Sequence, residues 1–332
     1  MPNPTQSDLH VNVPLTNVSV AYIQNRDFYI ANKVFPNVPV KHQSNVFYKY
    51  SKSDWRRSDV ARRAPGTESV GTGWNLDTDT YFAHVYAVHK DIDDQTRANA
   101  DSTFAIDKDA TNIVTNQLLL QRDIDWAAAY FKEGVWGTDV TLASTGSDAT
   151  GISWDLATSD PIQFFADKQV AAIQATGEKF NTLVLGANVL NGLKNHPAII
   201  DRIKYTQKGI ITEQLLSTLF DVDKILVSYA TVAGGPSIPD ARAQDAAADI
   251  KFVCTPNDAL FCHTASAPST MTPTAGYTFT WNGYLGGNAQ GIRMKRFRME
   301  HIAADRIEGE MTYDMKVVAK DMGMFIKNAV SA

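Results

Sequence analysis

Hydrophobic positions recur at a helical spacing over the longest uninterrupted segment of the chain, residues 105–132. One mostly apolar stripe, three or four residues apart, contains Ile106, Ala110, Ile113, Val114, Gln117, Leu118, Gln121, Ile124, Ala128 and Phe131. Polar side chains such as Arg122 and Asp125 fill the remaining positions, and no Pro or Gly interrupts the segment before Gly134. The pattern predicts a helix roughly 40 Å long, a strut against which other layers pack.

A second pattern, rich in aromatic and β-branched residues, lies upstream of this helix. Residues 46–50 and 80–89 predict two paired strands, whereas the segment between them has one proline, three glycines and few apolar side chains. The combination predicts a long hairpin whose tip cannot bury itself. Because an isolated hairpin is marginally stable in water, we expect it to lie against a neighbouring surface.

The rest of the chain predicts an extended N-terminal arm and a lobe of short helices and strands. Helices are predicted over residues 161–176, 187–194 and 197–203. Strands are predicted over residues 182–185, 224–229, 250–255, 259–263, 277–281, 292–302, 311–317 and 324–326. We expect the strands between residues 250 and 281 to form one antiparallel sheet, a lobe boundary at residues 134–155, and a flexible glycine-rich turn at residues 283–291.

Charge is divided between the predicted hairpin and the segment that follows it. The segment from Lys41 to Arg63, which leads into the hairpin, contains a basic cluster of Lys41, Lys49, Lys52, Arg56, Arg57, Arg62 and Arg63. The next segment contains an acidic cluster of Asp91, Asp93, Asp94, Asp101, Asp107 and Asp109. Opposite patches suit a contact in which the tip of one copy rests on the acidic segment of the next; an ordinary solvated loop is the alternative. The expected contact residues are Trp55, Arg56, Arg57, Arg62, Arg63, Asp107 and Asp109.

Composition narrows the class of protein. The chain has 332 residues, a net charge of −5 and 44% hydrophobic residues, which is typical of a folded protein large enough for two lobes. No apolar run approaches the ~20 residues that span a bilayer, so no membrane partner is expected. The two cysteines are expected to be reduced and buried. The acidity argues against general nucleic-acid binding, with residues 295–298 (Lys-Arg-Phe-Arg) as a local candidate for DNA contact or for a solvated or subunit-facing edge.

Catalytic motifs give little support to an enzyme. The chain contains no Walker A, dinucleotide-binding, nucleophile-elbow or zinc-protease motif. The strongest metal candidates are His84, His89, Asp91, Asp93 and Asp94. Positions 84 and 89 of one strand point to opposite faces, which disfavours a shared ion. No cofactor is therefore expected, and an α+β metal-dependent enzyme remains only an alternative.

The order of parts resembles the major capsid protein of tailed bacteriophages, an α+β, HK97-like capsid fold shared with encapsulins. The similar segments are residues 160–165 (DPIQFF), 182–186 (TLVLG) with Leu190 and Leu193, 219–227 (LFDVDKILV) and 308–326. The resemblance implies five parts: an N-terminal arm (1–42), the E-loop hairpin (43–89), a P-domain with the spine helix at 105–132 (90–154), an A-domain (155–300) and a second P-domain segment (301–332).

What the resemblance implies is a structural protein of the virion. It would self-assemble through hexamers and pentamers into an icosahedral head in the host bacterial cytoplasm and enclose double-stranded DNA without binding it specifically. Scaffolding, portal and decoration proteins are the further partners implied. The chain begins almost directly at the arm, so the resemblance implies a separate scaffolding protein. An encapsulin-type compartment with protein cargo is the alternative.

Overall fold

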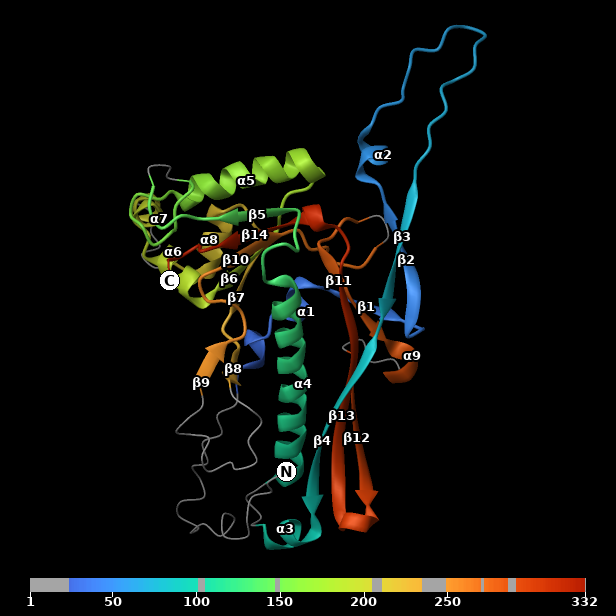
Figure 1. Ribbon diagram of the computed structural model, residues 1–332, viewed down its shortest axis with the longest axis vertical. Helices are drawn as coiled ribbons and strands as arrows, with labels where there is room; N and C mark the ends of the chain where they lie inside the picture. The colour runs from blue at the N-terminus through green and yellow to red at the C-terminus, as the bar shows by residue number, and fades with distance from the viewer. Residues whose placement is uncertain are drawn as a thin grey trace.

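A computed structural model describes residues 24–100, 105–146, 150–204, 211–234, 249–269, 272–285 and 291–331. The predicted strut is α4 (Ile106–Tyr130), which passes through the middle of the molecule between a lobe and a long sheet (Figure 1). The first 23 residues of the predicted arm, and residues 286–290 of the predicted glycine-rich turn, lie outside the described residues.

The long sheet is organised around one central strand. Its members are β1 (Asn37–Val40), β4 (His84–Asp93), β11 (Gly276–Trp281), β12 (Ile292–Met299) and β13 (Ala304–Val317). β13 pairs antiparallel with β4, β12 and β11, and β11 pairs in parallel with β1. The strand predicted over residues 311–317 is therefore confirmed as the end of a longer strand. α4 packs along β13 and β4 (Figure 1).

The lobe is built on a second sheet in the order β5-β14-β10-β6-β7. Its strands are β5 (Thr138–Thr141), β6 (Thr182–Gly186), β7 (Lys224–Ser228), β10 (Ala259–Cys262) and β14 (Gly323–Lys327). Its helices are α5 (Pro161–Thr176), α6 (Ala187–Lys194), α7 (Pro197–Ile203) and α8 (Glu213–Leu219). The predicted bounds of α5, α6 and α7 are confirmed.

Local chemistry explains where α5 begins and ends. The Asp160 carboxylate accepts hydrogen bonds from the backbone N–H groups of Ile162 and Gln163, and Pro161 occupies the first turn. Gly177 ends the helix with φ +81°, a conformation that costs glycine least. The buried face of α5 supplies Phe164 and Phe165 to the lobe core.

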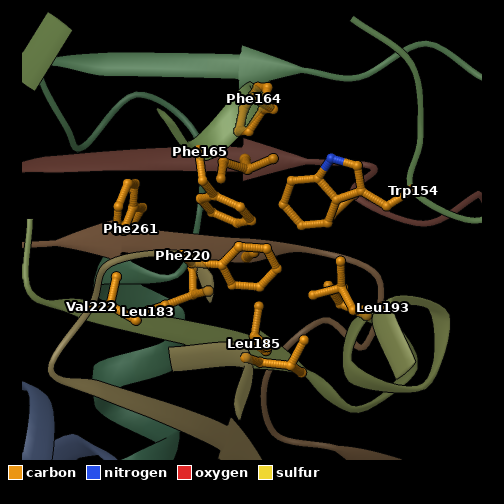
Figure 2. Packing of buried hydrophobic residues seen from close by; sticks show 14 of the residues in the cluster. Trp154, Phe164, Phe165, Leu183, Leu185, Leu193, Phe220, Val222 and Phe261 are labelled. Atoms are coloured by element: carbon orange, nitrogen blue, oxygen red, sulfur yellow. The ribbon is translucent and has the colours of Figure 1, made fainter. Parts of the chain in front are cut away.

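Aromatic rings fill that core (Figure 2). Phe165 is fully buried, with ring centroids 4.4 Å from Phe220 and 5.1 Å from Trp154. Phe164 and Phe261 also contact Phe165 through edge-to-face arrangements. Such pairs add stability beyond the area they bury. The lobe therefore has a complete core of its own within one subunit.

Smaller elements connect these layers. They are η2 (Arg26–Phe28), α1 (Ala31–Val34), β2 (Ser44–Tyr50), α2 (Lys52–Arg56), β3 (Leu76–Phe82), α3 (Asp94–Asn99), β8 (Thr231–Gly234), β9 (Asp249–Phe252), α9 (Asn282–Leu285), η4 (Glu300–Ile302) and η5 (Lys320–Met322). Both cysteines are free and buried, as predicted, and burial raises the pKa of each thiol to about 12.

Two strand predictions are wrong in their partners. The strands between residues 250 and 281 lie in three sheets: β9 pairs with β8, β10 lies in the lobe, and β11 lies in the long sheet. The return strand of the hairpin is β3, and the chain after Ala83 leaves the hairpin to pair with β13 as β4. The predicted boundary at 134–155 contains β5, which pairs with β14. Local patterns indicate a strand but not its partner, which is why these errors concern pairing.

The buried face of α4 also differs from prediction in its second half. Ala110, Val114 and Leu118 are buried as expected, but the stripe then turns to Arg122, Asp123, Trp126 and Ala127. Arg122, predicted on the polar face, is only 5% exposed. The shift occurs because α1 and the lobe cover this end of the helix, so tertiary packing decides which residues are buried.

A buried carboxylate holds the segment around α1 on α4. Asp123 is 1% exposed and accepts hydrogen bonds from the backbone N–H groups of Ile30 and Ala31, at 3.0 and 2.9 Å. Burial raises the pKa of Asp123 to about 6, against the opposing effects of these hydrogen bonds and of Arg122. Asp123 therefore connects the arm-side segment to the central helix from inside the core.

Candidate subunit interface

The hairpin is a two-stranded ribbon whose inner face rests on the long sheet. In β2 and β3, Tyr48 lies opposite Thr78 and Phe47 opposite Asp79. On the inner face, Phe47 and Tyr81 contact Phe279 of β11, with centroid distances of 5.2 and 4.5 Å. This anchor fixes the base of the ribbon, while the segment beyond α2 projects away from the body (Figure 1).

The outer face of the ribbon is apolar and exposed. Large hydrophobic side chains at alternate positions share this face: Val46, Tyr48, Tyr50, Leu76 and Phe82. Each is between 40% and 62% exposed. Contiguous exposed apolar surface marks an interaction site in folded proteins. Sequence reasoning identified the hairpin but missed this face, because aromatic residues on both faces of β2 obscure the two-residue alternation.

The predicted contact residues of the hairpin form two groups, one in or next to α2 (Trp55, Arg56 and Arg57) and one at the hairpin tip (Arg62 and Arg63). Trp55 is 56% exposed and lies edge-on to Tyr50. Arg56 donates hydrogen bonds to backbone carbonyls at the end of α5. Arg57 binds the Asp59 carboxylate at 2.9 Å within the hairpin. A hydrogen bond from Thr72 is the main cause that lowers the pKa of Asp59, and burial opposes this shift.

The hairpin tip carries the other two arginines. Arg63 donates to the backbone carbonyl of Thr67 across the tip. Arg62 is exposed and makes no hydrogen bond or ion pair with any described residue. The tip therefore offers one guanidinium that is free of partners in the described part of its own subunit.

The predicted acidic residues lie at the opposite end of the molecule from the hairpin tip (Figure 1). Asp107 accepts from Arg97 at 3.0 Å and lies 3.3 Å from Arg296. Asp109 is exposed, and its carboxylate has no partner among the described residues. One subunit therefore does not bring the basic and acidic groups together.

Asp101 of the acidic cluster lies outside the described residues, and three of the other five members, Asp91, Asp94 and Asp107, pair with arginines of their own chain. Asp94 pairs with Arg298 at 2.5 Å, and Asp91 pairs with Arg306 at 2.7 Å. Hydrogen bonds from Arg306 lower the pKa of the Asp91 carboxyl below its usual value, against the smaller opposing effect of burial. These pairs connect β4, α3, β12 and β13 at one end of the long sheet, so they act as ties between elements.

The candidate DNA-contact residues of β12 are likewise occupied by acids. Lys295 donates to Glu310 at 2.6 Å, and Arg296 binds Asp305 at 2.9 Å. Glu310 is 5% exposed and also accepts from Arg293 and Tyr284. The cationic side chains of β12 therefore pair with acidic side chains of the neighbouring strand β13.

We expect Glu310 to make stability depend on acid pH. Burial would raise the pKa of Glu310, but hydrogen bonds from its cationic partners and Tyr284 outweigh it and hold the pKa at about 2. The stabilisation of the folded subunit by ionised Glu310 is fully present above pH 4.5, the ordinary pKa of a glutamate, and is lost as the pH falls toward 2. Between pH 5 and 3, urea unfolding of the dispersed subunit should lose about 2 kcal/mol that Glu310→Gln does not lose. Equal slopes in the two proteins would contradict this.

The candidate metal ligands do not converge. Within the described ranges, no group of three or more His, Cys, Asp or Glu side chains is placed to hold an ion. Asp93 instead caps α3 through the Thr96 N–H.

A buried Ser159–His196 contact of 2.8 Å also fails as a nucleophile pair, since His196 Nδ1 accepts from the Ala198 N–H and Nε2 must then carry the proton. None of the described helices has the length and apolar character needed to cross a membrane.

The chain is similar in sequence to two phage proteins of known name. No family model matches the chain. The major capsid protein of Burkholderia phage BcepMu is 27% identical over 225 residues, covering 67% of this chain and 70% of that protein. The major capsid protein of Pseudomonas phage JBD67 is 23% identical over 334 residues, covering 97% and 98%. The similarity to the second protein therefore extends over nearly the whole chain.

Solved structures agree on the fold. A phage-related protein from Bordetella bronchiseptica has a TM-score of 0.67 at 21% identity, covering 92% of this chain and 94% of that one. The capsid of cyanophage P-SCSP1u gives 0.62 at 13% identity, with coverage of 97% and 93%. An encapsulin complex from Synechococcus elongatus gives 0.54 at 8% identity, with coverage of 95% and 93%. The chain therefore has the HK97-like fold that phage capsids and encapsulins share, and it is related to the major capsid proteins of phages.

Proposed function

We propose that this protein is the major capsid protein of a phage and that its copies assemble into the icosahedral head shell of the virion. The observation that carries the proposal is the exposed apolar outer face of the β2–β3 ribbon, an amount of uncovered surface that a solitary subunit has no means to bury. A second copy covering this face would bury it and hold the projecting hairpin in place. The subunits of a closed shell offer such a contact to every copy.

Within this proposal the parts of the chain take the roles implied by the family. The N-terminal arm and the E-loop hairpin reach neighbouring subunits, α4 is the spine helix of the P-domain, and the lobe is the A-domain. Of the predicted contact residues, we assign Trp55, Arg62 and Asp109 to neighbouring copies. Four others have partners within their own subunit, so they are secondary candidates: Arg56, Arg57, Arg63 and Asp107.

The proposed shell encloses double-stranded DNA without specific binding, in keeping with a net charge of −5 and with the acid-paired cations of β12. Assembly in the host cytoplasm, with scaffolding, portal and decoration proteins as separate chains, belongs to the same proposal. An encapsulin-type shell would instead enclose protein. Nuclease-resistant DNA in particles purified from infected cells supports the phage head, whereas a stoichiometric protein cargo favours the compartment.

Reversing the charge at the hairpin tip tests the contact. Arg62→Glu with Arg63→Glu should leave soluble, folded subunits that no longer form shells, because the tip would meet a neighbouring acidic surface with like charge. Negative-stain microscopy and analytical ultracentrifugation of the expressed protein measure this. Arg62→Lys with Arg63→Lys keeps the charge and should still assemble. Normal shells from the glutamate variant would remove the tip from the interface.

A further inference from the structure

The five-residue helix α2 touches the body of its own subunit at two places. Lys52 and Arg56 stand four residues apart, so they lie on one face of the helix. Lys52 forms an ion pair with Asp321 of η5. Arg56 reaches the last turn of α5, where its Nη1 lies 2.9 Å from the Ala175 carbonyl oxygen. Since α5 and η5 are in contact, both attachments lie on one region of the lobe.

The Arg56 contact matches the chemistry of a helix C-terminus. The guanidinium also approaches the carbonyl oxygens of Ile173 and Gln174, each at 3.4 Å. The carbonyls of Gln174 and Ala175 lie in the last turn, where carbonyl groups lack helical partners, whereas that of Ile173 already accepts the Gly177 N–H at 2.8 Å. The end of the helix carries a negative partial charge, which a cation stabilises. A planar guanidinium can serve several of these carbonyls at once, which an ammonium cannot.

Gly177, which ends α5, lies directly beside the Arg56 guanidinium. A Cβ placed on Gly177 would overlap the Arg56 guanidinium. The residue also has φ +81°, which disfavours most side chains. The sequence at the end of α5 therefore leaves room for the arginine of a segment more than one hundred positions away.

The hairpin and the lobe are otherwise separated here by a groove. Its volume is about 610 Å³, with Phe47 and Trp55 on the hairpin side and Pro268 and Pro273 on the body side. Because this gap is not filled by packed side chains, apolar contacts do not fix the angle of the hairpin at the level of α2. The contacts left to fix this angle are the Lys52–Asp321 ion pair and the hydrogen bonds of Arg56.

We propose that α2 is an intramolecular tether that sets the direction in which the hairpin leaves its own subunit, with Arg56 as the positioning residue. The consequence for assembly rests on the proposed shell function, but the tether acts in the dispersed subunit. A released hairpin would point in a range of directions and would reach the neighbouring copy less often. Arg56 thus acts within one chain, although sequence reasoning assigned it to the contact between chains.

Distance measurements in the dispersed full-length subunit test the tether. Spin labels at Ser58→Cys and Ile200→Cys report the hairpin relative to α7, because both positions are exposed and the native thiols are buried. Pulsed electron paramagnetic resonance should give a distance distribution that at least doubles in width in Arg56→Ala. The matched control, Arg62→Ala, removes the same charge from a residue without a described partner and should leave the width unchanged.

A second variant approaches the same contact from the other side. Gly177→Asn tolerates positive φ but places a side chain where the guanidinium lies, so it should broaden the distribution as Arg56→Ala does. Unchanged widths in both variants, or equal broadening in Arg62→Ala, would overturn the tether. If the widths respond as expected but the tethered protein forms no shells, the tether stands and the proposed function fails.

Discussion

Placing two glutamates on the outer face of the ribbon, Tyr48→Glu with Leu76→Glu, should abolish shell formation while the subunit stays folded. These side chains are 62% and 49% exposed, so their replacement removes little packing within the subunit. In a shell each copy would have to bury two unpaired carboxylates against an apolar neighbour, which costs several kcal/mol for each contact. Sedimentation should show dispersed subunits only, and negative-stain images should lack particles.

A matched substitution separates the ribbon from exposed apolar residues in general. Val170 on α5 is 66% exposed, so Val170→Glu adds a similar charge at a similarly open position on the lobe. Shells should persist in this variant. Far-UV circular dichroism should give the same spectrum for both variants and the unmodified protein. Shells from the double glutamate variant, or an equal loss in Val170→Glu, would contradict a special role for the ribbon.

Removing the buried carboxylate of α4 should give the largest loss of subunit stability. Asp123→Ala would leave the Ile30 and Ala31 N–H groups without their acceptor and the adjacent buried Arg122 without a counter-charge. Breaking such a buried arrangement from one side costs about 3–5 kcal/mol. The free energy of unfolding from urea titration of the dispersed subunit measures the loss.

The same helix offers a control for this measurement. Asp109 is an exposed aspartate of α4 whose carboxylate has no described partner, so Asp109→Ala should change stability by no more than about 0.5 kcal/mol. Hydrogen exchange adds a spatial check, since the amides of Ile30 and Ala31 should lose protection in Asp123→Ala first. A loss no larger than that of Asp109→Ala would show that the carboxylate does not hold the segment.

Elements whose signals are local could be predicted from the sequence. α5 is an example, because its Asp160 cap, its first-turn proline and Gly177 all lie within the helix or next to it. The long helix and the hairpin were equally visible from their periodicity and composition. The order of these parts also carried the resemblance to capsid proteins, which the comparisons confirm.

What the sequence could not supply depends on partners far along the chain. Nothing near Arg56 indicates that it reaches α5, and Arg122 occupies a helical position that looks polar until the segment around α1 covers it. The outer face of the ribbon was missed for a related reason. The contacts of Phe47 and Tyr81 with Phe279 show which side of the ribbon faces the body and which side is left open.

The long strand β13 has a mechanical consequence for the proposed shell. It extends without interruption from Ala304 to Val317, runs alongside α4, and is hydrogen-bonded in turn to β4, β12 and β11. A pull on the ribbon enters through β4, which continues the chain from β3, and through the Phe279 contact on β11, and both strands are paired with β13. A force from a neighbouring copy is therefore distributed as shear over the rows of backbone hydrogen bonds on both sides of β13. The sheet would share the force among its strands, and no single loop would carry it.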